Sequence, residues 1–331
     1  MRHYTNVLLL CGMLLFSHGN GIADDKIPVF VSIVPQKHFV QQIGKEFVDV
    51  QAMVQPGASP ATYEPKPRQM ADLTKASIYF SIGVPFESVW LERIAAANPG
   101  MKVVRTDSGI RKLAMAAHHH DDGDEDHEGE DHGDEDSGHE GEEHGDGNED
   151  HHEGESSEDA DHEDAGHTSG GLDPHIWLSP PLVKLQARSI ADALQDADPE
   201  HRREYEANFN AFAARIDRLD GELRRVFADR KGLQFMVFHP AWGYFAHAYG
   251  LKQMPIEIEG KNPKPAQLKS IIQHAREKGI RMIFVQPQFS ARSAELVAQE
   301  IGGQVAFADP LAEDWTANMR RVADQFRSAL K

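Results

Sequence analysis

The feature that most constrains the fold of this chain is a segment that cannot form a core, residues 118–167. It contains 24 Asp or Glu, 11 His and no Lys or Arg. It has almost no apolar side chains and no hydrophobic periodicity, so it cannot bury enough surface to offset the entropy of ordering. We therefore expect a disordered insert, with the folded part built from the residues on either side.

The insert also explains the acidity of the chain. The formal net charge is −19, from 34 Lys and Arg against 53 Asp and Glu, yet outside the insert 34 bases face 29 acids. The folded part is thus close to balanced, at +5. No basic stripe interleaved with aromatic residues is present, and a polyanionic insert repels phosphates, so we expect no nucleic-acid partner.

On both sides of the insert, short β-branched runs alternate with helical stretches, which is typical of parallel α/β sheets. The expected strands are 29–34, 48–54, 77–82, 102–105, 234–238, 254–258, 282–285 and 305–307. The expected helices between them are 36–43, 68–75, 86–97, 242–249, 265–278, 291–301 and 314–330. The predicted fold class is α/β, with two α/β lobes that each contain a mainly parallel sheet.

One long helix is expected between the lobes. Asp198 suits its N-cap and Pro199 its first turn, and from Tyr205 to Val226 apolar residues recur in steps of three and four. Gly232 suits the position just past its end. We expect a rigid helix that joins the two lobes; a long core helix inside one domain is the alternative.

The chain begins with a pattern typical of a secretory signal peptide. Arg2 precedes the apolar run Val7–Phe16, and small residues follow as far as Ala23. The run is shorter than the roughly 20 apolar residues that span a bilayer. Cys11, the single cysteine, lies inside this run, so we do not expect lipoprotein anchoring through it. The mature chain then has no thiol, and a bound metal must be held by nitrogen and oxygen.

The predicted organisation therefore has five parts. They are a signal peptide (1–23), an N-terminal lobe (24–117 with 168–197), the His/acidic metal-binding insert (118–167), a linker helix (198–231) and a C-terminal lobe (232–331).

Three residues form a candidate metal site. Ligands of parallel α/β sheets bind outside the carboxyl ends of the strands. His239 follows the expected strand 234–238, Asp309 follows 305–307, and His175 comes shortly after the insert; a proline adjoins each of the three. Two imidazoles and a carboxylate suit a borderline cation such as zinc. Taken singly, a histidine near a strand end is more often a packing residue than a ligand, so the prediction depends on the combination of the three.

The histidines of the insert are a second candidate. Their density far exceeds background, and His-rich tracts commonly bind metals loosely. We expect a low-affinity zinc-binding loop formed by His118, His119, His120, His127, His132, His139, His144, His151, His152, His162 and His167.

Six short motifs carry a family resemblance. They are Val31-Ser32-Ile33-Val34-Pro35, Gly57 through Tyr63-Glu64-Pro65, Asp173-Pro174-His175, Phe238-His239-Pro240-Ala241-Trp242, Ile258-Glu259-Gly260-Lys261 and Asp309-Pro310-Leu311. From about Val29 to the C-terminus the chain resembles the zinc-binding solute receptors of bacterial metal ABC importers, the ZnuA-like branch of the TroA-like family. A His- and Asp-rich loop in this place is typical of the zinc-type members.

The resemblance implies two lobes joined by a rigid helix, with Zn²⁺ as bound cargo in the cleft between them. It implies ligation by His175, His239 and Asp309, a location in the periplasm, and delivery to the membrane permease of a zinc ABC importer. We expect a monomer. Manganese-type members usually carry a carboxylate where this chain has His239, and nitrogen-rich sites suit zinc better than manganese.

The chain departs from the family at one ligand. The family pattern is Gly-x-x-Pro-His-x-Tyr-Glu-Pro, and here Ala61 stands in place of its histidine. An alanine methyl cannot coordinate a metal. The fourth position is left to His38, to Glu64, to a histidine of the insert or to water.

Other functions compete with the zinc receptor. A receptor for manganese or another divalent metal is one, and a periplasmic zinc buffer or chaperone, in which the insert does the binding, is another. A secreted zinc hydrolase would also fit three ligands plus water. The chain has no His-Glu-x-x-His or Gly-x-Ser-x-Gly motif and no evident general base, so we expect no enzyme.

Overall fold

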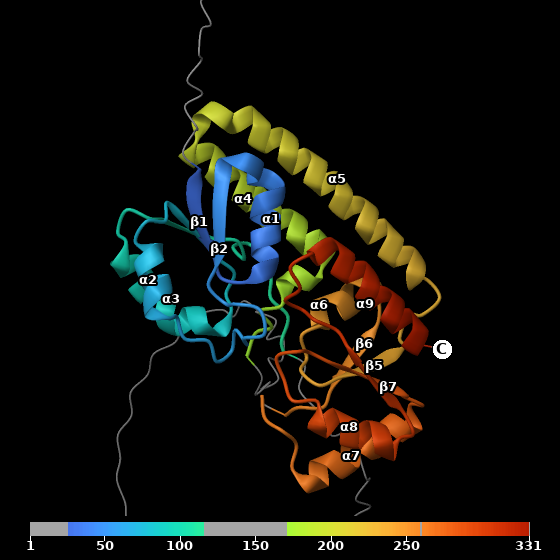
Figure 1. Ribbon diagram of the computed structural model, residues 1–331. Coiled ribbons are helices and arrows are strands. Elements are labelled where there is room, and N and C mark those ends of the chain that lie inside the picture. The colour runs from blue at the N-terminus through green and yellow to red at the C-terminus, as the bar shows by residue number, and fades with distance from the viewer. Residues whose placement is uncertain (1–25, 116–170, 259, 331) are drawn as a thin grey trace, which may run out of the picture. The chain divides into compact units, whose positions relative to one another are not determined.

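The computed structural model describes residues 26–115, 171–258 and 260–330 (Figure 1). The expected signal peptide and the insert with its eleven histidines lie outside the described residues. The chain divides into two compact units, each assembled from three segments. Unit 1 comprises residues 1–110, 179–222 and 311–320, and unit 2 comprises residues 111–178, 223–310 and 321–331. This division is finer than the lobe boundaries expected from the sequence, which stay a prediction.

Each unit contains one four-stranded sheet in which all strands are parallel. The sheet of unit 1 has the order β2-β1-β3-β4, from β1 (Ile27–Val31), β2 (Val48–Ala52), β3 (Ile78–Ser81) and β4 (Lys102–Arg105). The sheet of unit 2 has the order β6-β5-β7-β8, from β5 (Gln234–Val237), β6 (Lys252–Pro255), β7 (Met282–Val285) and β8 (Gln304–Phe307). All eight expected strands are present, and the α/β class with two parallel sheets is confirmed.

In unit 1, helices α1 (Val34–Gly44), α2 (Pro67–Leu73), α3 (Pro85–Ala97) and α4 (Pro180–Ala197) accompany the sheet. A buried aromatic cluster anchors α1: the ring of Phe39 lies 6.0 Å from Phe212 and 5.3 Å from Trp315. Helix α4 was not expected. Its apolar pattern is nevertheless in the sequence, because Val183, Ala187, Ile190 and Leu194 recur at helical spacing and are all buried.

The long helix α5 (Arg202–Val226) is shorter than expected at both ends. Asp198 does act as a cap, but for a 3₁₀ turn, Pro199–His201, whose last backbone N–H donates to its carboxylate at 3.4 Å. Gly232, with φ at +80°, lies in the left-handed region past the helix end. Residues of α5 up to Glu222 belong to unit 1 and those from Leu223 belong to unit 2, so this helix joins the two α/β units.

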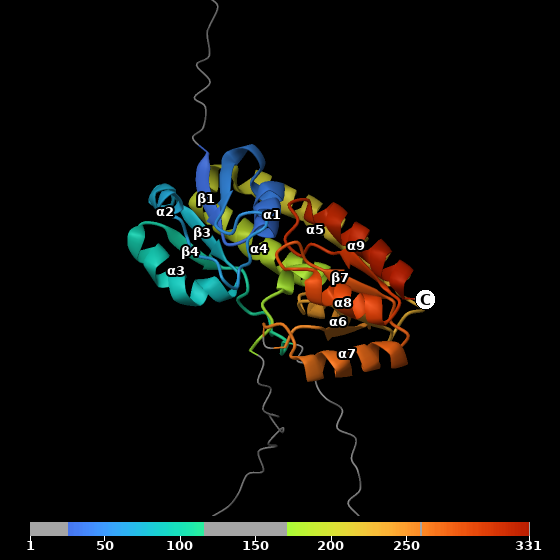
Figure 2. The same cartoon turned by 60° about the horizontal axis from the view of Figure 1, so that its bottom comes forward.

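The sheet of unit 2 is covered on both faces, as Figures 1 and 2 show. Successive side chains of its strands point to opposite faces of the sheet. On one face, Met236 and Ile283 pack into a cluster with apolar residues of α7 (Pro265–Glu277) and α8 (Arg292–Glu300). Their neighbours point the other way, so Phe235 and Phe284 lie 4.3 and 4.5 Å from the ring of Phe326 on α9 (Trp315–Ala329). Helix α6 (Gly243–Tyr249) packs on this second face through Phe245, 5.4 Å from Phe326.

The helices of the described part of the chain are too short or too polar to cross a membrane.

Candidate metal site

The candidate site lies at the carboxyl ends of the strands of unit 2. His239 stands two residues after β5, and its backbone is held by Gln286, the first residue after the neighbouring β7. The Gln286 amide nitrogen donates to the His239 carbonyl at 2.7 Å, and its oxygen accepts from the His239 N–H at 3.3 Å. Gln286 is fully buried, so these two bonds fix where the imidazole leaves the sheet.

The imidazole of His239 is oriented by Glu257. Because β5 and β6 pair in parallel with Val237 opposite Pro255, the residues two positions further along, His239 and Glu257, lie side by side. His239 Nδ1 is 2.6 Å from Glu257 Oε1, and the Glu257 side chain is buried. A carboxylate only accepts, so Nδ1 is the donor of this bond, and in the neutral imidazole Nε2 then keeps its lone pair for a metal. The ring of Phe289 stacks on the imidazole at 5.0 Å.

His175 is held in the same way by Asp173. Its Nδ1 lies 2.7 Å from Asp173 Oδ1, which also accepts from the His175 backbone N–H at 2.8 Å. The Tyr244 hydroxyl donates to the Asp173 carbonyl at 2.8 Å, which ties this loop to α6. Burial lowers the pKa of His175, and the pull of Asp173 in the other direction does not outweigh it. The imidazole is therefore kept neutral, the form that binds metal.

The two imidazoles lie together. Their ring centroids are 5.2 Å apart with an interplanar angle of 70°, and both residues belong to unit 2. Each has Nδ1 engaged by a buried carboxylate, the arrangement that fixes the tautomer of metal-binding histidines. The pair can thus offer two Nε2 atoms to one small cation.

Asp309 is not grouped with them. It stands two residues after β8, is half-buried, and accepts from the Gln288 side-chain amide at 3.0 Å. In the sheet order, β8 is two strands away from β5, so the backbones that carry Asp309 and His239 leave the sheet roughly 10 Å apart. Across the described ranges, no three His, Cys, Asp or Glu side chains are close enough to hold a metal ion.

The remaining predicted residues that the structure describes belong to unit 1. His38 is half-buried on α1, with Nε2 3.5 Å from the Thr316 hydroxyl and its ring 6.1 Å from that of Phe212. Burial lowers the pKa of His38. Ala61 and Glu64 are both exposed in the loop before α2.

Two carboxylates of the site were not identified from the sequence as partners of the histidines. Asp173 stands in one of the six motifs without a role of its own, and Glu257 is not among the residues that the sequence predicts as ligands. The signal for Glu257 was its position, the same number of residues past β6 as His239 is past β5. Using that signal requires knowing that β5 and β6 are neighbours, which follows from the folded sheet.

The fold defines a protein of two parallel-sheet α/β units, in which His175 and His239, each beside a buried carboxylate, lie together at the carboxyl ends of the strands of unit 2. The chain belongs to the ZnuA family, described as "Zinc-uptake complex component A periplasmic", which matches residues 29–329. The expected resemblance is confirmed, and with it a zinc-uptake solute-binding class.

Known proteins that are similar to this chain include zinc uptake proteins. The high-affinity zinc uptake system protein ZnuA of Bacillus subtilis (strain 168) is 27% identical over 316 residues, covering 92% of this chain and 87% of that one. The protein of the same name from Brucella abortus (strain 2308) is 31% identical over 325 residues, covering 95% and 92%. Among solved structures, a crystal structure of ZnuA is 38% identical with a TM-score of 0.75 over 93% of this chain and 100% of that one. A ZnuA deletion mutant with zinc bound is also 38% identical, with a TM-score of 0.74 over 93% and 99%.

Proposed function

We propose that this protein captures zinc with high affinity in the periplasm and delivers it to the membrane permease of an ABC-type zinc uptake system. The observation that carries the proposal is the histidine pair, because the two imidazole rings lie 5.2 Å apart and each Nδ1 lies within hydrogen-bond distance of a buried carboxylate. Nitrogen ligands of this kind favour zinc over manganese. Membership of the ZnuA family supports the same cargo.

The proposed ligands are His175, His239 and Asp309. Asp309 would have to exchange its bond from Gln288 for the metal. Because Ala61 supplies no ligand, His38, Glu64, a histidine of the insert or a water molecule completes the coordination sphere. Capture is an equilibrium rather than a reaction, so we propose no enzymatic activity. The ligands must be deprotonated, and zinc binding therefore weakens as the pH falls through the histidine range.

The other parts of the chain have roles in the same process. Residues 1–23 direct secretion and are removed, Cys11 carries no lipid anchor, and the mature protein acts as a monomer without nucleic acid. Residues 24–117 with 168–197, and residues 232–331, form the two lobes that the helix within 198–231 connects. The histidines within 118–167 gather zinc at low affinity and raise its concentration beside the site.

A competitive titration with zinc and manganese tests the proposal. The full chain and a variant lacking residues 118–167 should share one tight site that prefers zinc. The double variant His175→Ala/His239→Ala should lose that site, and His247→Ala, an exposed histidine of α6 in the same unit, should keep it. Loss of nearly all binding on removal of the insert would instead identify a zinc buffer, and a preference for manganese would identify a manganese receptor.

A further inference from the structure

The two units differ sharply in charge once the insert is set aside. Unit 1 carries 17 Lys and Arg and 20 Asp and Glu, a net charge of −3. Unit 2 without residues 118–167 carries 17 Lys and Arg but only nine Asp and Glu, a net charge of +8. The insert, at −24, is thus attached to the basic unit.

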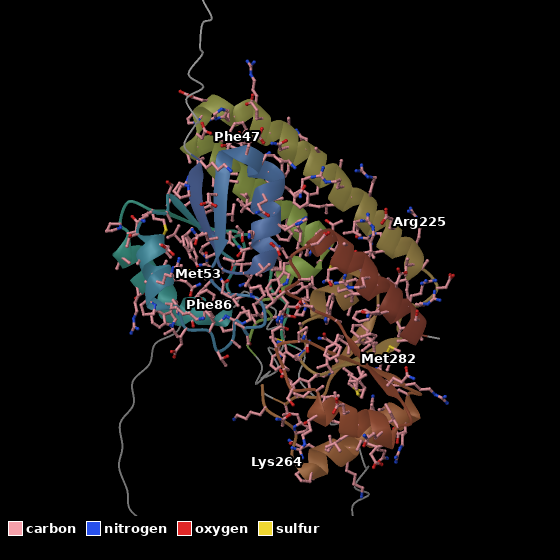
Figure 3. All side chains as sticks on the ribbon, in the orientation of Figure 1. Phe47, Met53, Phe86, Arg225, Lys264 and Met282 are labelled. Atoms are coloured by element: carbon pink, nitrogen blue, oxygen red, sulfur yellow. The ribbon has the colours of Figure 1, made fainter. Side chains whose placement is uncertain are left out.

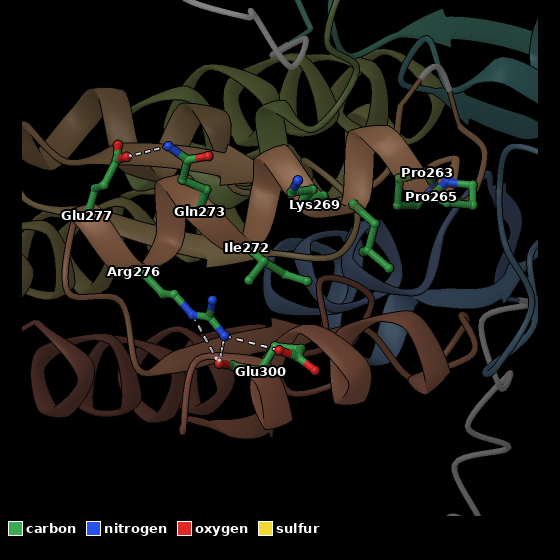
Figure 4. Close-up of a pocket in the computed structure, with 9 residues that line it drawn as sticks. Pro263, Pro265, Lys269, Ile272, Gln273, Arg276, Glu277 and Glu300 are labelled. Atoms are coloured by element: carbon green, nitrogen blue, oxygen red, sulfur yellow. Dashed lines mark hydrogen bonds and ion pairs between the residues drawn. The ribbon is translucent and has the colours of Figure 1, made fainter.

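The positive charge of unit 2 is concentrated around α7. Between residues 261 and 281 six cations face one acid, Glu277, and all six cations are exposed. We call these six the α7 basic surface: Lys261, Lys264, Lys269, Arg276, Lys278 and Arg281. Figure 3 labels Lys264 where α7 begins, and Figure 4 shows Lys269 and Arg276 among the residues that line a groove beside α7, together with Glu277 and Glu300. The volume of this groove is about 630 Å³.

Most of these cations are not neutralised within the described part of the chain. Arg276 pairs with Glu300 at 3.0 Å, and the other five form no ion pair with any described residue. In unit 1, by comparison, Lys184 pairs with Asp217 and Arg320 pairs with Glu222. A local excess of unpaired like charge repels itself and attracts a polyanion.

The described residues nearest to the insert on its two sides lie next to each other in unit 2. The Met115 N–H donates to the Gly171 carbonyl at 2.9 Å, and the Asp173 N–H donates to the Leu113 carbonyl at 2.8 Å. Half of the insert, about 25 residues, spans up to roughly 80–90 Å when extended. A folded body of about 100 residues has a radius of gyration of about 13 Å, so the insert can reach every face of unit 2.

We propose that the acidic insert, residues 118–167, docks on the α7 basic surface of its own chain. Charge complementarity and the short tether favour this occupant, since attachment gives the insert an effective concentration that a free anionic partner does not have. The apolar floor of the groove, formed by Leu268 and Ile272, plays no part, because the insert has almost no apolar side chains. If zinc is bound as proposed above, docking keeps a metal-carrying insert beside the unit that contains His175 and His239.

Carbodiimide cross-linking of the full chain, which joins carboxylates to lysine amines, tests the docking. It is performed without metal, so its outcome is independent of zinc binding. At about 0.01 M salt, where the Debye length is about 30 Å, insert carboxylates should link to Lys261, Lys264 and Lys269 far more than to the exposed unit 1 lysines Lys66 and Lys75. At about 1 M salt, where the Debye length is about 3 Å, the preference for the α7 lysines over Lys66 and Lys75 should disappear.

Charge-reversed variants make the test specific. The variant Arg276→Glu/Arg281→Glu leaves every lysine available for cross-linking. It should reduce links at α7 by up to about fivefold for each ion pair that an insert carboxylate can no longer form with an arginine. The matched variant Arg68→Glu/Arg203→Glu, at exposed arginines of unit 1, should leave them unchanged. Mixing with ¹⁵N-labelled protein should show links within one chain. Equal linking to Lys66 and Lys75, insensitivity to salt, or links mainly between labelled and unlabelled chains would overturn the proposal.

Discussion

The two units share the same sheet topology but differ in the residues at the carboxyl ends of their strands. Both have four parallel strands in the same relative order, β2-β1-β3-β4 in unit 1 and β6-β5-β7-β8 in unit 2. At the carboxyl ends of its strands, unit 2 carries His239 and Glu257, and His175 with Asp173 lies against them. In unit 1, Ala61 stands at the position where the family pattern has a histidine.

The difference separates scaffold from function. The parallel sheet provides an edge where residues two positions past each strand become neighbours, and only the residue types at that edge decide whether it can bind a metal. The polar residues at the corresponding edge of unit 1 bond one another: the Ser32 hydroxyl lies 2.8 Å from the Tyr79 hydroxyl, and Gln36 donates to Thr106 at 3.1 Å. Metal chemistry is therefore expected to depend mainly on unit 2.

The largest expected effect comes from removing the imidazoles. His175→Ala or His239→Ala should each weaken zinc binding by more than about 100-fold, because a ligand contributes more than the 10- to 100-fold of an outer-shell partner. Isothermal titration of the full chain measures the tight site. The exposed His247→Ala serves as the control in the same unit, and a tight site that survives both ligand variants would place zinc elsewhere.

A smaller loss should follow from changing the carboxylates that hold the histidines. Glu257→Gln and Asp173→Asn should each lower zinc affinity about 10- to 100-fold, because a neutral amide no longer fixes or polarises the Nδ1 proton. Glu295→Gln, an exposed position of α8, is the matched control. Wild-type affinity in both variants would show that these buried carboxylates serve only packing.

Introducing a histidine at position 61 of unit 1 should give this unit a metal ligand that it lacks at that position. Ala61→His should tighten zinc binding by about tenfold, less than a full ligand contributes because an exposed loop must be ordered around the metal. Thr62→His, at the adjacent exposed position, should change nothing. Equal affinities in all three proteins would mean that the loop takes no part in coordination.

The smallest expected effect is a pH dependence of metal-free stability. Burial lowers the pKa of His175, so the unfolded chain takes up this proton at a higher pH than the folded protein does. Stability is then fully present above the unfolded pKa of about 6.5 and is lost as the pH falls toward the folded pKa, by at most about 1.4 kcal/mol per pH unit for one proton. Urea unfolding at several pH values should show a weaker dependence in His175→Gln, and an unchanged slope would contradict a buried neutral imidazole.

Much of the fold was predictable because it rests on local patterns. The β-branched runs marked all eight strands, and the three- and four-residue steps from Tyr205 onward marked α5. The edge strand β6 begins at Lys252 rather than at the expected residue 254, because polar residues can pair at an edge without adding to the hydrophobic signal. Helix α4 was missed although its buried positions follow a helical period.

The site was predictable only in part, because its key contacts depend on strand order. His175 follows the insert, and His239 and Asp309 each follow an expected strand. These positions identified the three residues as candidates. The pairing of His239 with Glu257, the clamp by Gln286 and the stacking by Phe289 all join residues far apart in the chain. No spacing rule connects such residues until the order β6-β5-β7-β8 is known.

The central claim is that zinc binds to the histidine pair of unit 2. A crystal structure of the protein with one equivalent of zinc, with anomalous scattering recorded at the zinc edge, tests it most directly. The claim predicts one strong peak about 2.0–2.1 Å from Nε2 of both His175 and His239. A strong peak that touches neither imidazole would contradict it.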